Sequence, residues 1–518
     1  MTGFPLLTLI VFTPLAGALM LALLPREHDA GLRRAAFVFS LVPLALSLWM
    51  LGRFDPADAG FQFVERASWI PAWGVTYNFG VDGVSLFLVV LTALLTPIVL
   101  LDAWGNIHRR VKEYLVLMLL LETGMMGALV ALDLFLFYVF WEVMLVPMVL
   151  LIGVWGGPKR IYAAVKFVLF TMAGSLPMLV AIVYLAWRAK TGGTLVFDYE
   201  RFLALGLSGR EQVLCFVAFA LAFAIKVPLF PFHTWLPDAH TEAPTGGSVI
   251  LAGVLLKMGT YGFLRFALPL FPDAVAAMAP AIAGLAVVGI VYGALVATVQ
   301  PDLKRLVAYS SVSHLGFVML GLVALTPTAV VGSVYQMISH GLSTGALFLL
   351  VGMIYERRHT RMISEFGGLW SVVPVFSVCL LLAMLASAGL PGLNGFVGEF
   401  LILLGAFGRW PWATAVATSG VVLGALYLLW MYERTIFGPV THEETRRLKD
   451  IGPRELAVIT PVLALCFVMG LYPAPILRRI EPAVARTIAT VQRRTTPAAV
   501  ATAQAPAPML PVAAGWQP

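Results

Sequence analysis

Long runs of apolar residues follow one another along almost the whole chain, separated by short segments that carry charge, proline or glycine. Windows of about 19 residues, the length that crosses a bilayer as a helix, predict fourteen spans. These are residues 3–24, 34–52, 78–101, 112–131, 133–153, 162–187, 211–231, 245–267, 274–297, 304–323, 328–354, 373–404, 411–432 and 455–474. The pattern therefore predicts an all-α polytopic membrane protein with about fourteen transmembrane helices.

Composition excludes a water-soluble enzyme. Of 518 residues, 60% are apolar and 12% are charged, whereas about a quarter of the residues in a soluble domain are charged. The formal net charge of +7 does not indicate nucleic-acid binding, because Lys and Arg lie in short loops between apolar runs. They are more numerous in the loops after odd-numbered spans, which predicts that both termini lie outside. Cys215, Cys379 and Cys466 are too far apart to indicate a disulfide framework or a metal site.

Several ionisable residues interrupt the predicted spans at depths where hydrocarbon surrounds the chain. Each costs about 2.5–3.5 kcal/mol at the centre of a helix, so we expect each to have a function or a partner. The strongest candidates for proton translocation are Glu142, Lys226, Lys257, His340 and Glu399. Further relay candidates are His314, Glu122 and His233. For His314 and His340, a hydrogen-bonded core residue is the competing interpretation. His233 and His240 are expected either to line an entry funnel or to cap a short helix.

Two of these spans are expected to be broken. Pro228 and Pro231 directly follow Lys226, and proline removes a backbone donor and clashes with the preceding turn. The glycine-rich sequence LPGLNG precedes Glu399 and predicts a second break. Broken membrane helices are tolerated where they line a cavity or pack on protein, and one in each half is typical of inverted repeats. Glu142 precedes Lys226 by 84 residues and His314 precedes Glu399 by 85, which agrees with a repeat.

These residues suggest a mechanism for moving a proton. A buried amine keeps its proton while a carboxylate stands close and releases it when the carboxylate withdraws. We therefore expect Glu142 to control Lys226. The hypothesis is that a proton enters from the cytoplasm at Lys226, crosses through Lys257 and His340, and leaves through Glu399.

Five stretches of the chain carry a resemblance to a known family. They are ALDLFLFYVFWEVMLVPM, FAIKVPLFPFHTWLPDAHTEAPTGGSVILAGVLLKMGTYG, YSSVSHLGFVMLG, QMISHGLSTGALFLLVG and LASAGLPGLNGFVGEF. Over about residues 1–475 the chain resembles the antiporter-like membrane subunits of respiratory NADH:quinone oxidoreductase, complex I. It most resembles the chain M group, because Glu399 stands where the sibling groups L and N usually carry a lysine. Gly246, where close relatives are expected to carry alanine, is one departure.

The resemblance implies a domain organisation of two inverted five-helix repeats. Its parts are residues 1–111 with spans one to three, 112–270 as the first repeat, 271–437 as the second, 438–480 with a loop and the last span, and 481–518 as a disordered tail. No long lateral helix is expected after the last span. The resemblance also implies proton-channel roles for the five strongest candidates named above.

The resemblance implies partners and places the cofactors on other chains. The partners are sibling antiporter-like subunits of the membrane arm and, through them, a peripheral arm that oxidises NADH. FMN and iron–sulfur clusters are expected there, because this chain has neither a phosphate-cradling glycine loop nor a cysteine cluster. No metal and no nucleic acid is expected on this chain, while bound lipid is compatible with it. The expected location is the bacterial inner membrane.

Two other functions stay open at this point. A subunit of a multi-subunit cation/proton antiporter shares these motifs, and so does a subunit of a membrane-bound hydrogenase. The identity of Glu399 and the overall motif match favour the oxidoreductase. A purely structural scaffold is disfavoured, because it has no use for several deep charges.

Overall fold

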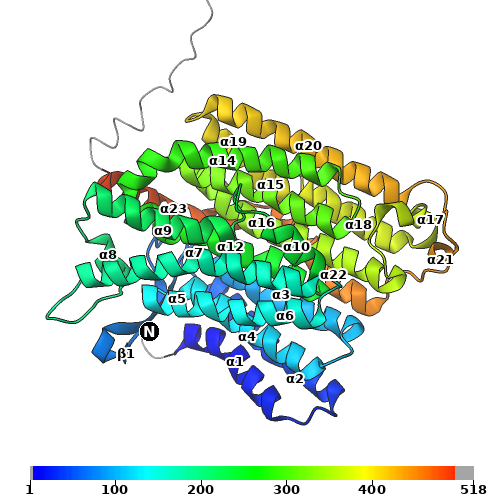
Figure 1. Cartoon of the computed structure of the whole chain (residues 1–518), viewed down its shortest axis with the longest axis horizontal. Helices are drawn as coiled ribbons and strands as arrows, with labels where there is room; N and C mark the ends of the chain where they lie inside the picture. Colours follow the sequence, from blue (N-terminus) through cyan, green and yellow to red (C-terminus); the bar gives the residue numbers. More distant parts are fainter. Residues whose placement is uncertain (1–3, 496–518) are drawn as a thin grey trace, which may run out of the picture.

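The computed structural model describes residues 4–495, and helices running side by side make up nearly all of it (Figure 1). Twelve helical segments of this part are long and apolar enough to cross a membrane. They are α1 (Leu6–Leu23), α2 (Asp29–Arg53), α3 (Leu86–Asn106), α4 (Val111–Val130), α5 with α6 (Leu134–Val143 and Leu145–Trp155), α7 (Arg160–Arg188), α11 to α13 (Thr245–Leu270), α14 (Pro272–Thr298), α15 (Leu303–Ala324), α16 (Pro327–Arg358), α20 (Pro411–Ile436) and α22 (Pro453–Leu471). Two further crossings are made by pairs of shorter helices, which gives the fourteen spans that the sequence predicts.

The first broken crossing consists of α9 (Gly209–Lys226) and α10 (Trp235–Glu242). The helix α9 begins at a capping box, in which the Ser208 N–H donates to Glu211 Oε2 at 2.8 Å. It ends at Lys226, directly before the two prolines. The indole Nε1 of Trp235 donates to the Ile225 carbonyl at 2.9 Å, so a side chain satisfies a carbonyl that the break frees.

The second broken crossing consists of α18 (Pro374–Ser387) and α19 (Asn394–Phe407). Between them Gly389 and Gly392 have φ values of +76° and +94°, which only glycine adopts without strain. Asn394 Nδ2 then donates to the Ser339 carbonyl of α16 at 3.2 Å, and Ser339 Oγ donates to the Asn394 carbonyl at 3.1 Å. The second half-helix is therefore fixed against α16.

The crossing between Thr245 and Leu270 is wholly buried and irregular. Its pieces are α11 (Thr245–Ile250), η2 (Leu251–Leu255), α12 (Leu256–Gly262), η3 (Phe263–Ala267) and α13 (Leu268–Leu270), where η2 and η3 are π turns. Single π turns inside helices are frequent at functional sites. Lys257 lies in the α-helical piece between the two π turns.

The buried centre of the molecule is built from α11 to α13, α15 and α16, whereas the helices around it expose apolar side chains. On α7, for example, Leu169 and Val180 are 64% and 70% exposed. Apolar exposure of this extent on a helix face is typical of contact with lipid or with another membrane subunit. The ionisable candidates on α12, α15 and α16 therefore lie inside the molecule, away from the helix faces that are exposed.

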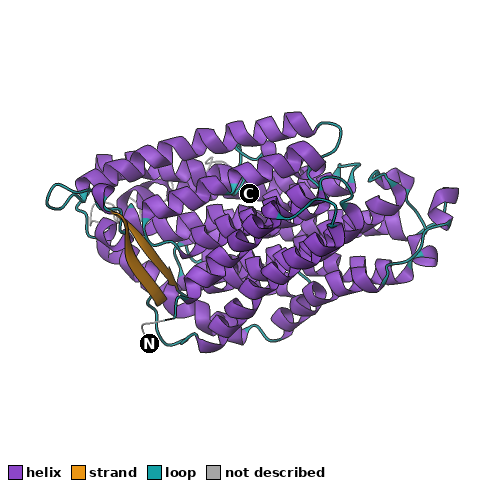
Figure 2. Ribbon diagram, turned by 90° about the horizontal axis from the view of Figure 1, so that it is seen from below, coloured by secondary structure: helices purple, strands orange, loops and turns teal. Residues whose placement is uncertain are grey.

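A β-hairpin lies at one end of the helices, which we call the hairpin end (Figure 2). It consists of antiparallel strands β1 (Gln62–Ile70) and β2 (Val75–Val81), joined by η1 (Pro71–Trp73). The expected third span, 78–101, is therefore wrong at its beginning, because residues 78–81 belong to β2 and the helix starts at Leu86. Asp133 ties the hairpin to α5, since its Oδ2 accepts the Thr76 N–H at 2.9 Å and its Oδ1 the Leu136 N–H at 3.1 Å.

Short helices complete both ends of the bundle. The helix α8 (Tyr199–Leu203) lies at the hairpin end, and α17 (Leu369–Val372) and α21 (Glu443–Arg446) lie at the opposite end (Figure 1). The turn η4 (Ile363–Glu365) follows α16 in the chain.

A helix follows the last crossing and covers part of the segment 481–518, which was expected to be a disordered tail. This helix, α23 (Ala474–Arg494), buries Ile480, Val484, Ile488 and Val491. Spacings of three and four place these residues on one face, which packs against the bundle at the hairpin end, while the helix also carries five arginines. Composition did not reveal this pattern, because the apolar positions are few; the rest of the expected tail, 496–518, lies outside the described residues.

Candidate functional site

Lys257 and His340 form a hydrogen-bonded pair at the centre of the bundle. Lys257 Nζ lies 2.7 Å from His340 Nδ1, and both side chains are 1% exposed. The same ammonium donates to the Ala252 carbonyl in the π turn η2. The two residues come from α12 and α16, which lie in different expected repeats. The pair therefore joins the two halves of the chain.

A second hydrogen-bonded group lies next to this pair. His314 on α15 places its ring centroid 5.7 Å from that of His340. His314 Nδ1 lies 2.6 Å from Glu399 Oε1, and Gln336 Nε2 donates to the same oxygen at 2.9 Å. Lys257, His340, His314 and Glu399 thus form a buried row, which we call the polar row, with a ring contact but no hydrogen bond between the two histidines.

The Glu399 end of the polar row depends on local structure that the sequence encodes. Glu399 lies in the first turns of α19, which begins only after the glycine-rich break. Gln336 precedes His340 by one turn on α16, so both side chains lie on one face of that helix. Tyr427 on α20 closes the group, with its hydroxyl 3.3 Å from His314 Nε2. Gln336 and Tyr427 were not predicted from the sequence; only the one-turn spacing of Gln336 from His340 could have indicated it.

Lys226 lies apart from the polar row in a buried aromatic environment. Its Nζ lies 5.3 Å from the centroid of the Trp141 ring and 5.6 Å from that of Phe167. Trp141 directly precedes Glu142 on α5. Both Lys226 and Glu142 are described, and no ion pair within 4.0 Å joins them. The aromatic faces stabilise a cation there.

The remaining predicted candidates lie outside these groups. Glu122 on α4 is fully buried, and neither carboxylate oxygen has a hydrogen-bond partner within the described residues. His233 stacks on Phe230, with centroids 5.5 Å apart, in the break after Lys226. His240 on α10 was treated as a residue of an entry funnel or a cap. It stacks on Phe348 with centroids 4.6 Å apart and both of its ring nitrogens lack partners in residues 4–495.

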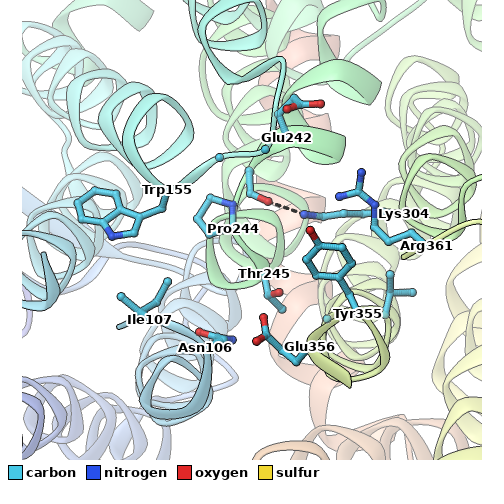
Figure 3. A pocket seen from close by; sticks show the side chains of 15 residues that line it. Asn106, Ile107, Trp155, Glu242, Pro244, Thr245, Lys304, Tyr355, Glu356 and Arg361 are labelled. Atoms are coloured by element: carbon cyan, nitrogen blue, oxygen red, sulfur yellow. Dashed lines mark hydrogen bonds between the residues drawn. The ribbon is translucent and has the colours of Figure 1, made fainter. Parts of the chain in front are cut away.

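A polar cavity opens at the end of the bundle opposite the hairpin (Figure 3). Its volume is about 220 Å³, and Glu242, Lys304, Glu356 and Arg361 are among its lining residues. Lys304 donates to the Ala243 carbonyl, the interaction drawn as a dashed line. Charged side chains of both signs line this cavity.

No group of three or more His, Cys, Asp or Glu side chains suited to a metal ion occurs within residues 4–495. The three cysteines lie in separate buried positions. The groups assembled in the polar row are instead amine, imidazole and carboxylate, which accept and release protons. Their arrangement suits proton transfer between neighbouring groups.

Comparison with known proteins identifies the family. A family model described as the NADH:quinone oxidoreductase/Mrp antiporter transmembrane family matches residues 131–424, which is more than half of the chain. The chain belongs to this family. A relative from Rhodobacter capsulatus, NADH-quinone oxidoreductase subunit M, is 46% identical over 93% of this chain and 96% of the relative.

Solved structures agree with this membership. A chain of respiratory complex I from Thermus thermophilus matches with a TM-score of 0.85 and 34% identity, covering 94% of this chain and 99% of that one. A chain of the Mrp complex from Dietzia matches with a TM-score of 0.82, 21% identity and coverage of 94% and 99%. At 21% identity the second likeness concerns the fold alone. The predicted fold class and the predicted family are therefore confirmed.

The family match also bears on which candidates lie in the shared part of the chain. The matched segment 131–424 contains Lys226 and its aromatic environment as well as the whole polar row. Glu122 lies before it. As a member of the family, the chain is a multi-pass membrane protein of a type that bacteria possess, as the Rhodobacter relative shows.

Proposed function

We propose that this chain is subunit M of an NADH:quinone oxidoreductase and that it carries protons across the membrane. The single observation that carries the proposal is the polar row, in which amine, imidazole and carboxylate groups run through the centre of a membrane-spanning bundle. The family, the subunit M relative and the complex I structure support the assignment to that enzyme.

In the proposed mechanism, Lys226 receives a proton first. While Glu142 approaches, the ammonium is stabilised by the carboxylate and by the Trp141 ring. When Glu142 withdraws, the buried amine gives up its proton toward Lys257. The separation seen here corresponds to the withdrawn arrangement, since no ion pair within 4.0 Å joins the two described side chains.

The proton then moves along the polar row. Lys257 transfers it to His340 across their 2.7 Å hydrogen bond. The next step passes the proton from His340 to His314, whose ring centroids lie 5.7 Å apart. His314 and Glu399 share the last hydrogen bond, from which the proton leaves. His233 and Glu122 are side relays in this scheme.

We assign the redox chemistry to other subunits. FMN and the iron–sulfur clusters belong to a peripheral arm, which oxidises NADH and reduces quinone, and this chain acts as the translocating part of the enzyme. Its partners are sibling antiporter-like chains and the lipid bilayer, which the exposed apolar faces of α7 and α20 suit. The proposed location is the bacterial inner membrane, and the proposed repeat boundaries are 112–270 and 271–437.

The test is proton pumping by the assembled enzyme in membrane vesicles driven by NADH. Lys226→Ala or Glu142→Ala should abolish the pH gradient, because each removes a group that delivers protons to the polar row. Lys190→Ala and Glu433→Ala are matched controls, since both residues are exposed and lie at the ends of helices. Full pumping with either loading variant would refute the roles given to Lys226 and Glu142.

A cation/proton antiporter is the second candidate, because the family description includes Mrp antiporters. The two functions differ in their dependence on sodium. Proton pumping that persists without sodium or potassium, and that requires NADH, supports the oxidoreductase. A pH gradient that is dissipated only by added sodium would favour the antiporter.

A further inference from the structure

A buried ion pair lies between Lys257 and the hairpin end of the bundle. Arg265 Nη2 lies 2.5 Å from Asp82 Oδ1, and the two side chains are 5% and 4% exposed. Asp82 lies directly after β2, and its Oδ1 also accepts the backbone N–H groups of Val84 at 3.0 Å and Ser85 at 3.2 Å. The backbone thus fixes the carboxylate, and the carboxylate fixes the guanidinium.

Arg265 follows Lys257 along the same crossing. Lys257, Tyr261 and Arg265 are spaced four residues apart, which places them along one side of the helix. Eight residues correspond to about 12 Å of helix, so Arg265 lies well outward of the centre. The route from Lys257 straight toward the hairpin end therefore passes Tyr261 and Arg265.

The hydrogen bonds along this route have a fixed direction. Arg265 Nε donates to the Tyr261 hydroxyl oxygen at 3.2 Å, and that hydroxyl donates to the Leu129 carbonyl at 2.9 Å. A proton relay needs a group that can both accept and donate. The guanidinium has only donors and stays charged in proteins, so it cannot accept a proton arriving from Lys257 and separates Tyr261 from the Asp82 carboxylate.

Aromatic rings hold the guanidinium in place and cover it. Its central carbon lies 4.9 Å from the centroid of the Phe61 ring and 5.4 Å from that of Tyr261. The central guanidinium carbon of Arg486 on α23 also lies 5.2 Å from the centroid of the Phe61 ring. Two guanidinium groups therefore lie against one ring at the hairpin end, and each also has a carboxylate partner, Asp82 for Arg265 and Glu200 for Arg486 at 4.0 Å.

We propose that Arg265, held by Asp82, Tyr261 and Phe61, closes the direct exit from Lys257 toward the hairpin end, so that protons leave Lys257 only toward His340. The inference rests on the proposed function and assigns a positioning role to Arg265 within it. A fixed arginine excludes protons from other membrane pores by its charge. Without such a barrier, a proton could pass Lys257 without using the second half of the chain.

The experiment uses the assembled enzyme in liposomes and measures passive proton permeability without NADH, together with protons pumped per electron. Arg265→Gln keeps a polar side chain of similar length and removes the charge. We expect its passive proton permeability to rise several-fold and its proton-to-electron ratio to fall, with NADH:quinone electron transfer retained. Arg265→Lys keeps a cation beside Asp82 and is expected to restore low permeability.

Controls separate the loss of charge from general damage. Arg66→Gln removes a partly exposed ion pair with Asp198 at the same end and should leave permeability unchanged. The permeability of a trapped dye should stay low in every variant, because a damaged bundle leaks without selectivity. Asp82→Asn removes the carboxylate that holds the guanidinium, so we expect a rise in proton permeability that is smaller than in Arg265→Gln.

Three results would overturn the inference. The first is an assembled Arg265→Gln enzyme with the permeability and ratio of the unmodified enzyme. The second is equal leakage in Arg265→Gln and Arg265→Lys, which would mean a structural role only. The third is an Asp82→Asn enzyme with the proton permeability of the unmodified enzyme, which remains decisive if Arg265→Gln does not assemble. Failure of the proposed function is a different result, namely continued pumping in Lys226→Ala.

Discussion

His314 Nδ1 lies 2.6 Å from Glu399 Oε1, although 85 residues separate them in the chain. Both side chains are nearly inaccessible, at 7% and 6% exposure. A carboxylate in such surroundings needs hydrogen-bond donors, and His314 and Gln336 supply them. The contact therefore makes Glu399 part of a shared network and gives the polar row a defined last member.

Replacement of Glu399 should stop translocation at the end of the row. Glu399→Ala removes the last acceptor, and we expect proton pumping to fall at least tenfold while the enzyme still assembles. Glu399→Asp retains a carboxylate and should preserve part of the activity. The measurement is the NADH-driven pH gradient in vesicles, normalised to the rate of electron transfer. Undiminished pumping in Glu399→Ala would exclude Glu399 from the proton path.

A positive charge at position 257 should not be sufficient for proton pumping. Lys257→Arg keeps a cation next to His340, but a guanidinium does not release its proton at physiological pH. We therefore expect Lys257→Arg to pump as poorly as Lys257→Ala. Lys166→Arg is the matched control, because Lys166 forms a half-buried ion pair with Asp238 that arginine can also make. Normal pumping by Lys257→Arg would show that Lys257 acts through its charge and does not carry the proton.

The sequence predicted the crossings and the breaks because both depend on local chemistry. Apolar runs determine which segments enter the bilayer, and the prolines after Lys226 and the glycines before Glu399 end helices wherever they occur. The structure shows both breaks where they were expected. Most of the central charged residues could be found in the same way, because a charge in an apolar run is visible without any knowledge of packing.

The contacts between distant helices could not be predicted in this way. Gln336 and Tyr427 are ordinary residues in a sequence, and only packing brings them to Glu399 and His314. The separation of Glu142 from Lys226 likewise depends on how α5 lies against α9. The helix α23 was missed because its few apolar positions are matched to a surface of the bundle that a sequence does not display.

Asp133 should make stability depend on pH. It is fully buried between β2 and α5, and burial raises its pKa above 3.8 despite hydrogen bonds from Thr76, Phe135 and Leu136. A carboxyl whose folded pKa is raised stabilises the fold most at low pH, and this contribution is lost as the pH rises through the folded pKa. The stability of Asp133→Asn relative to the unmodified enzyme should therefore increase from about pH 4, near the pKa of Asp in an unfolded chain, to about pH 7.

The measurement for Asp133 is thermal unfolding of the assembled enzyme at the two pH values. Asp58→Asn, in the exposed loop before β1, is the control and should show no such trend. Asp133→Ala loses the helix cap and should be less stable than Asp133→Asn by about 0.5–2 kcal/mol. A stability difference for Asp133→Asn that is the same at both pH values would contradict this explanation.

A methyl group at Gly398 should disturb Glu399 from the neighbouring helix. A Cβ there would lie 2.4 Å from Gln336 Oε1 and 2.9 Å from the Gln336 Cα, and a backbone atom of α16 cannot move aside easily. We expect Gly398→Ala to destabilise the enzyme by about 1–3 kcal/mol through overpacking. It should also lower pumping, because Gln336 would lose its position beside Glu399. Gly284→Ala is the control, since nothing lies within 4 Å of the added atom, and thermal unfolding together with vesicle pumping distinguishes the two glycines. Equal behaviour of both variants would mean that α19 shifts without consequence for the polar row.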